Sequence, residues 1–117
     1  MDSSSILDSV KRLLGISEDD DGFDYEVKDL INAEFLTLHQ LGIGPEAGFS
    51  INGPDDTWGS YTDNKHLLDA VRQFVYLRFR LIFDPPASSV VSDAINSRIS
   101  ELEFRLNSQA EGDASES

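Results

Sequence analysis

The residues best suited to metal chemistry are three consecutive aspartates followed by a glycine, Asp19-Asp20-Asp21-Gly22. Calcium prefers carboxylate oxygens, and an EF-hand loop needs a glycine at its sixth position and a bidentate glutamate at its twelfth. With Gly22 at position six, position one is Ser17 and position twelve is Lys28, so the pattern fails at both ends. We therefore expect a solvated acidic linker that favours the start of a helix.

The other reactive side chains form no recognisable catalytic pattern. His39 and His66 lie in different segments, outside any His-x-x-x-His or Glu-x-x-His pair, and the chain has no cysteine. Gly42-Ile43-Gly44-Pro45 follows a predicted helix and lacks the lysine of a phosphate-binding loop. The sequence thus predicts no enzyme, no metal site and no cofactor.

Length and composition indicate a small folded protein. The chain has 117 residues, 39% hydrophobic and 26% charged, which favours a single domain with one core. Nine basic residues against 22 acidic ones give a net charge of −13, which disfavours sequence-independent DNA binding. No signal peptide or membrane span is apparent, so we expect a protein made in the cytosol without membrane contact.

The elements that must position any site are four predicted helices. Apolar periodicity predicts them at residues 5–14, 23–41, 64–83 and 88–107, with Ser5 capping the first and Asp21 or Asp24 capping the second. The predicted fold is mainly α, a compact four-helix domain over residues 1–107. Residues 108–117 lack large apolar side chains, which predicts a flexible acidic tail.

The segment between the second and third helices, residues 42–63, combines five glycines and two prolines with large apolar residues. A long structureless loop is uncommon in a compact domain unless it is functional. The alternation around Phe49 and Ile51, followed by Gly53-Pro54-Asp55-Asp56, predicts either a long loop or a short β-hairpin.

Two opposite charges fall within apolar helix faces. At 100° per residue, Glu34 lies inside the stripe of the second helix and Arg78 inside that of the third. Because each charge is costly to bury alone, we expect the two to meet as a buried ion pair. The pair could form within one subunit, the simpler interpretation, or across a subunit boundary.

Several residues are candidates for contact with other proteins. Leu36 and Phe104 lie opposite the apolar stripes of their helices, where singly exposed apolar residues are also ordinary. The loop supplies Phe49, Ile51, Trp58 and Tyr61. On the third helix Lys65, Arg72 and Arg80 form a basic strip that could bind the acidic face of another copy, or neutralise the second helix of the same copy.

The layout resembles the head-tail connector, or neck adaptor, proteins of long-tailed bacteriophages. The likeness covers roughly residues 4–107 and rests on the order and spacing of five segments: Ile6-Leu7-Asp8-Ser9-Val10-Lys11 with Leu14-Gly15-Ile16, Leu41-Gly42-Ile43-Gly44-Pro45, Trp58, Arg80-Leu81-Ile82-Phe83-Asp84-Pro85-Pro86, and Glu101-Leu102-Glu103-Phe104-Arg105-Leu106-Asn107.

The resemblance implies a structural virion protein without catalytic residues. It implies a ring, usually of twelve copies, that is assembled in the bacterial cytoplasm and lies at the head-tail interface. This ring would contact the portal protein above and a head-completion or tail-side neck protein below, and DNA would pass through without sequence-specific binding. The loop at residues 42–63 and the residues after Asn107 become candidate contact elements.

A second interpretation comes from the charge alone. A protein of net charge −13 could mimic DNA and inhibit a nucleic-acid-binding enzyme. Such a decoy has no need of an aromatic-rich loop, and this favours the connector interpretation.

Overall fold

The computed structural model describes residues 3–116, with side chains described from residue 3 to residue 108. Its elements are α1 (Ile6–Leu13), α2 (Asp24–Gln40), the single turn α3 (Trp58–Tyr61), α4 (Lys65–Phe83) and α5 (Ser89–Glu116). The prediction of a mainly helical chain with four principal helices is confirmed.

Local chemistry fixes where the helices begin. The Ser5 hydroxyl accepts a hydrogen bond from the Asp8 amide at 3.2 Å, and the Asn64 side chain accepts one from the Leu67 amide at 3.1 Å. The predicted aspartate cap of α2 is wrong. Phe23 occupies the N-cap position without a side-chain hydrogen bond, and the preceding turn closes instead through the backbone of Asp21 and Asp24.

Glycines end the first two principal helices. Gly15 and Gly42 have φ of 76° and 82°, a conformation that an L side chain disfavours. At the end of α2, the Ile43 amide donates a hydrogen bond to the Leu38 carbonyl, and the Gly42 amide donates one to the His39 carbonyl. These two hydrogen bonds form a Schellman motif. This motif stops α2 at Gln40 and sends the chain into the long loop.

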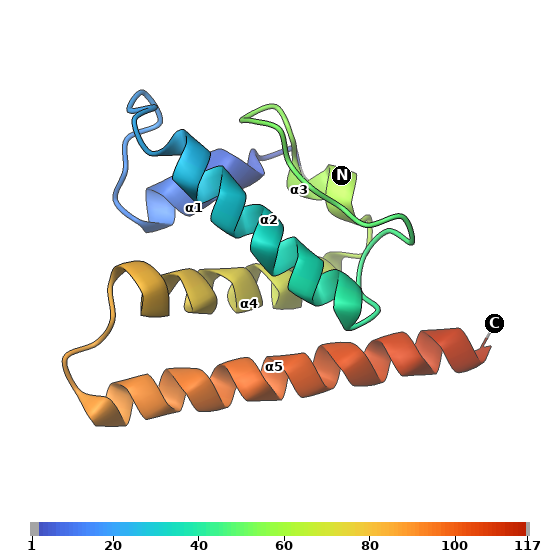
Figure 1. Ribbon diagram of the computed structural model, residues 1–117. Helices are drawn as coiled ribbons and strands as arrows, with labels where there is room; N and C mark the ends of the chain where they lie inside the picture. Colours follow the sequence, from blue (N-terminus) through green and yellow to red (C-terminus); the bar gives the residue numbers. More distant parts are fainter. Residues whose placement is uncertain (1–2, 117) are drawn as a thin grey trace.

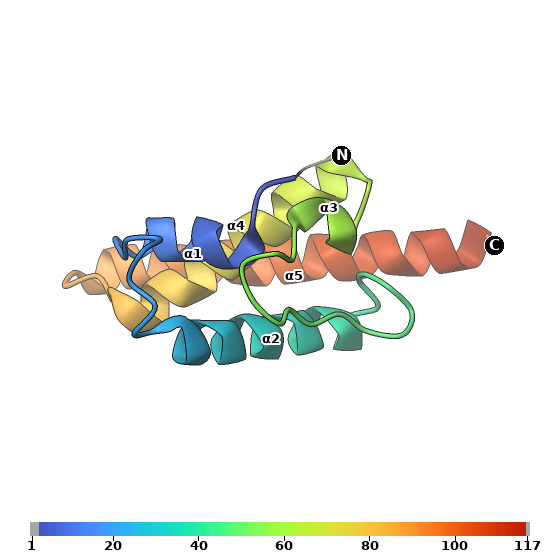
Figure 2. The same cartoon turned by 90° about the horizontal axis from the view of Figure 1, so that it is seen from above.

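The helices form three layers, with α4 between α5 and the pair α1–α2 (Figure 1). Helix α5 runs back along α4 after the Pro85-Pro86 turn, and α1 and α2 lie on the other side of α4, as the view from above also shows (Figure 2). The result is a flattened molecule of 44 × 37 × 20 Å. A single core of buried residues connects all layers.

Helix α5 is longer than predicted. It continues past Asn107 to Glu116, a stretch that has no proline and contains helix-favouring glutamine, alanine and glutamate. Its last turns project beyond the other helices (Figure 1). The flexibility expected for residues 108–117 stays a prediction, and Ser117 lies outside the described residues.

The possible hairpin in residues 42–63 is absent, and the segment is a loop with one helical turn. The Asp56 carboxylate accepts from the amides of Asn52 and Gly53, which closes the turn without a strand ladder. The Asn32 side chain accepts a hydrogen bond from the Ile51 amide at 2.7 Å and donates one to the Ile51 carbonyl at 3.1 Å. These hydrogen bonds replace the pairing that a hairpin would need, so the described loop contains no strand.

The loop pairs with the start of the chain instead. The Ile6 amide donates to the Asp56 carbonyl and the Trp58 amide to the Ser4 carbonyl, around an isolated antiparallel bridge between Ser5 and Thr57. This contact holds α3 beside the first turn of α1.

Candidate protein-interaction surface

The loop aromatics, expected at a protein interface, lie mainly inside the subunit. Trp58 is fully buried, Ile51 and Tyr61 are nearly so, and Phe49 is half-buried against the core. We define the aromatic cluster as Phe35, Phe49, Trp58, Tyr61 and Tyr76, whose rings make edge-on or tilted contacts at centroid distances of 4.9–6.4 Å. The interface expectation is therefore corrected for Ile51, Trp58 and Tyr61, because their burial leaves no surface for a partner.

Tyr61 shows how tightly the loop closes over this cluster. Gly44, at φ 92°, lies so close that a Cβ atom there would come within 2.7 Å of the Tyr61 hydroxyl. That hydroxyl is buried and has no hydrogen-bond partner among the described residues. Burial also raises the pKa of Tyr61 well above its usual range.

Glu34 and Arg78 meet within one subunit. The Arg78 Nε atom donates to Glu34 Oε2 at 2.7 Å, and the Arg78 guanidinium also lies over the Phe74 ring. The Glu34 side chain is 5% exposed whereas that of Arg78 is 37% exposed, so the carboxylate depends on this partner more than the guanidinium does. The pair joins α2 to α4.

A second internal ion pair was not predicted. Lys11 is buried in α1, where its ammonium lies 2.7 Å from Asp24 Oδ1 and donates to the Glu18 carbonyl at 3.2 Å. The Asp24 carboxylate is the main cause that raises the pKa of Lys11. The signal in the sequence is the position of Lys11, one residue after buried Val10 and four after buried Leu7.

The basic strip of α4 is only partly available to another protein. Lys65 and Arg80 are exposed, but Arg72 is half-buried, with its guanidinium carbon 5.3 Å from the Trp58 ring centroid. Arg72 thus helps to cover the aromatic cluster. Lys65 and Arg80 lie near opposite ends of the same helix.

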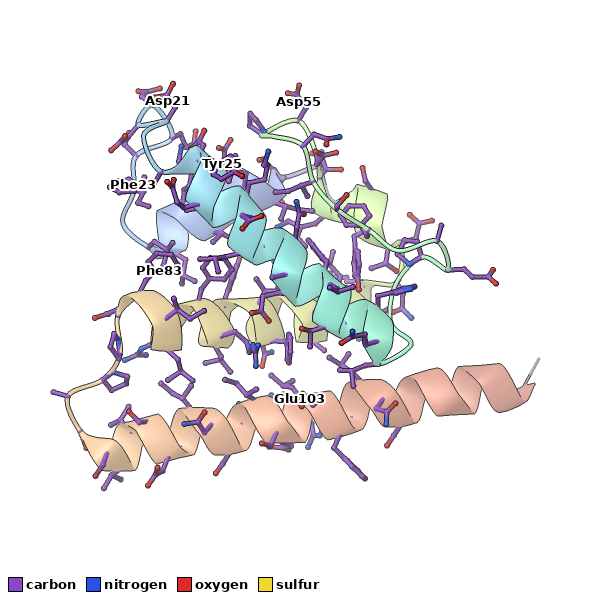
Figure 3. All side chains as sticks on the ribbon, in the orientation of Figure 1. Asp21, Phe23, Tyr25, Asp55, Phe83 and Glu103 are labelled. Carbon is purple, nitrogen blue, oxygen red and sulfur yellow. The ribbon has the colours of Figure 1, made fainter. Side chains whose placement is uncertain are left out.

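Three apolar side chains at helical spacing with the core residues of their helices stay exposed. Leu13, Phe23 and Ile82 are 46%, 56% and 51% exposed. Phe23 and Phe83 lie at the same end of the molecule (Figure 3). We define the end surface as Leu13, Leu14, Phe23, Arg80 and Phe83.

Two hollows of about 560 and 250 Å³ meet at the end surface. The larger lies between α1 and α4, and its lining includes Leu13, Leu14, Arg80 and Phe83. The smaller is lined by Leu14, Phe23 and Phe83 among others, so the two hollows share Leu14 and Phe83. The end surface is thus an indented apolar area with exposed Arg80, and the lining of the hollows also includes the carboxylates of Asp84 and Glu26.

Leu36 and Phe104 point outward, as the helical spacing predicts. Leu36 on α2 is 57% exposed and Phe104 on α5 is 73% exposed. Phe104 lies about 200° around the helix from buried Leu102 and Leu106, which places it on the face of α5 turned away from α4.

Within the described residues, no group of three or more His, Cys, Asp or Glu side chains has the geometry to hold a metal ion. The part of the chain that the structure describes also contains no helix of sufficient length and apolarity to cross a bilayer. What the described surface offers is exposed apolar area beside charged residues, a composition suited to protein–protein contact.

The sequence matches a known protein family. Residues 6–113 match the family model described as phage connector protein. The searches of curated proteins and of solved structures return no significant match. Because the family model spans almost the whole chain, from the first residue of α1 nearly to the end of α5, the chain belongs to the phage connector protein family, and its role is that of a structural connector.

Proposed function

We propose that this protein forms a ring of identical copies at the head-tail junction of the virion, between the portal protein and the tail-side neck proteins. The family match over residues 6–113 is the observation that carries the proposal. The exposed apolar residues support it, because the subunit leaves large side chains in solvent at several separate places. A ring needs two different contact surfaces on each copy.

The charge of the chain supports passage of DNA through such a ring. At −13 per copy, the surface repels phosphates, and phosphate-binding patches would slow transit. Acidic residues gather in the α1–α2 connection and around the Asp55 turn, and labelled Asp21 and Asp55 project from the same side of the molecule (Figure 3). DNA is thus a passing cargo in this proposal.

The contact residues are proposed from what remains exposed. Leu36 and Phe104 supply apolar area, Lys65 and Arg80 supply charge, and half-buried Phe49 supplies the outward edge of the loop. Arg72 takes part only through its support of Trp58. The residues after Asn107 extend α5 and are candidates for contact with the portal or with the tail-side neck.

The decisive experiment mixes the purified chain with the portal protein of the same phage and images the particles by electron microscopy. We expect an added ring on one end of the portal, with a whole-number ratio of copies to portal subunits. If the chain instead leaves the portal unoccupied and inhibits a nucleic-acid-binding enzyme, the acidic DNA-mimic function is correct. The portal without added chain is the matched control.

A further inference from the structure

The end surface carries an exposed arginine beside its apolar hollow. Arg80 forms no ion pair with any side chain that the structure describes, although it lies beside exposed Leu13 and Phe83. Exposed Asp84 also lines this hollow, one turn after Arg80, but forms no ion pair with it. A hollow that offers apolar contacts and an unpaired guanidinium can receive an apolar side chain that has a carboxylate next to it.

The chain itself supplies that combination on another helix. Phe104 is among the most exposed large apolar residues, and the preceding residue is the half-buried Glu103. Glu103 has no cationic partner among the described side chains, whereas nearby Glu101 is paired with both Arg98 and Arg105. Of the carboxylates around Phe104, Glu103 is therefore the one available for a new ion pair.

We infer that the end surface of one copy receives Phe104 of a neighbouring copy, with Arg80 of the first pairing with Glu103 of the second. This inference rests on the proposed ring and names the contact that builds it. Within a single subunit the two partners cannot meet, because the hollow lies on the α1 side of α4 and Phe104 on the opposite side of α5.

The positions of the two surfaces give the contact a direction. The end surface lies at the last turn of α4, next to the start of α5, while Phe104 lies 15 residues beyond Ser89, about 22 Å along the α5 axis. The two surfaces are different and well separated. Each copy can therefore bind Phe104 of one neighbour at its end surface and place its own Phe104 in the end surface of another. Such a head-to-tail contact forms a closed ring when the rotation between neighbouring copies is a whole fraction of a turn.

The size of the contact is consistent with an anchor inside a larger interface. A buried phenylalanine contributes roughly 150–250 Å², whereas a stable interface buries about 1,200–2,000 Å² in total. Phe104 in the hollow would thus be a central contact, and the surrounding surfaces of α2 and α5 would supply the rest. Truncation of such a central aromatic usually has a large effect on association.

Because the chain contains no cysteine, the contact can be tested by site-specific cross-linking. The double variant Asp84→Cys/Ser100→Cys leaves Leu13 and Phe104 in place, because exposed Asp84 lines the hollow and exposed Ser100 lies one helical turn before Phe104. It is treated with a short thiol-reactive cross-linker under the conditions in which rings form on the portal. We expect a ladder of covalent oligomers on a denaturing gel, up to the full ring. Each single-cysteine variant is the control and gives no species larger than a dimer.

A matched variant tests whether the ladder is specific to the face of α5 around Phe104. Asp84→Cys/Asp55→Cys places the second thiol at an exposed site in the loop, on the side of the molecule away from α5 (Figure 3). We expect no ladder from it. A ladder with Asp55→Cys and none with Ser100→Cys would overturn the assigned contact.

A charge exchange tests the ion pair without cysteines. Arg80→Glu and Glu103→Arg should each lower the fraction of assembled chain at least tenfold at a fixed concentration, and the double exchange should restore it. If the double variant assembles no better than the singles, the pairing is wrong.

The remaining outcomes separate this inference from the proposed function. Rings on the portal without the Asp84–Ser100 ladder would overturn the inference and leave the proposed function intact. Cross-links from Ser100→Cys to the portal instead of a second copy would also overturn it. No assembly under any condition, with or without the portal, would overturn both.

Discussion

The aromatic cluster and the end surface use similar side chains for opposite purposes. In the cluster, Trp58 and Tyr61 come from a glycine-rich loop and are buried. At the end surface, Leu13 and Phe23 come from the ends of regular helical patterns and stay about half exposed. Trp58 and Tyr61 are thus buried although they come from a loop, whereas Leu13 and Phe23 are exposed although they belong to helical patterns.

The difference has a physical cause in what each segment can reach. The loop folds back because the Asn32 side chain holds the backbone of Ile51 and the Ser4 carbonyl accepts from Trp58, which brings its aromatics against α2 and α4. Helix α1 ends at Leu13 and the chain turns away at Gly15, so the residues that follow do not cover Leu13. Burial depends on a neighbouring segment and not on residue type.

The largest effect is expected from Trp58→Ala. Trp58 is fully buried, contacts two other aromatic rings and donates through Nε1 to the Ser9 hydroxyl at 3.3 Å. Its removal should lower the free energy of unfolding by about 3–5 kcal/mol in urea denaturation. The control Trp58→Phe keeps most of the packing and should cost less than half as much. A loss below about 1 kcal/mol for the alanine variant would contradict the buried placement.

Gly44→Ala should be the next largest, at roughly 2–3 kcal/mol. The change adds a left-handed backbone penalty at φ 92° and a contact of the new Cβ with the Tyr61 hydroxyl. Gly48→Ala is the matched control, because Gly48 has φ 90° but nothing within 4 Å of the added atom. It should cost about 1 kcal/mol. Equal losses would show that Tyr61 does not press on Gly44.

Arg78→Met should cost about 2 kcal/mol, since it leaves the buried Glu34 carboxylate without its partner while Arg78 itself is partly solvated. The double variant Glu34→Leu/Arg78→Met should recover most of this loss. A double-mutant cycle by thermal melting measures the coupling. Strictly additive losses would mean that the 2.7 Å contact contributes nothing to stability.

Two raised pKa values predict a loss of stability in alkali. Lys11 and Tyr61 both have folded-state pKa values above those of the unfolded chain. Their contribution is fully present below the unfolded values, near pH 10, and is lost as the pH rises through the folded ones. The urea midpoint should therefore fall above pH 10. The decline should be shallower in Tyr61→Phe and in Lys11→Met, and an unchanged slope in both would refute the assignment.

The helices and the Glu34–Arg78 pair could be predicted from sequence because both depend on local periodicity. Apolar residues at helical spacing mark a face, and two opposite charges inside such faces need each other. Leu13, Phe23 and Ile82 also have this helical spacing, yet the structure leaves them about half exposed. Periodicity identifies a face of a helix, but how far along the helix that face is covered depends on tertiary packing.

The loop could not be predicted because its conformation depends on distant partners. The side chain of Asn32 on α2 holds Ile51, 19 residues later, and Ser9 on α1 meets Trp58, 49 residues later. Nothing in residues 42–63 alone specifies these contacts. The Lys11–Asp24 pair was missed for a similar reason, since the α1–α2 connection had to fold back before the two charges could meet.

The smallest effect on stability is expected from Leu13→Ser. Leu13 is 46% exposed, so its removal should lower the free energy of unfolding by about 1 kcal/mol or less. Leu7→Ser, six residues earlier in the same helix and almost fully buried, is the matched control and should cost several times more by urea denaturation. If exposed Leu13 serves a contact between copies, its variant should remain folded yet assemble poorly on the portal. A Leu13→Ser chain as unstable as Leu7→Ser would instead place Leu13 in the core of the subunit and remove it from the end surface.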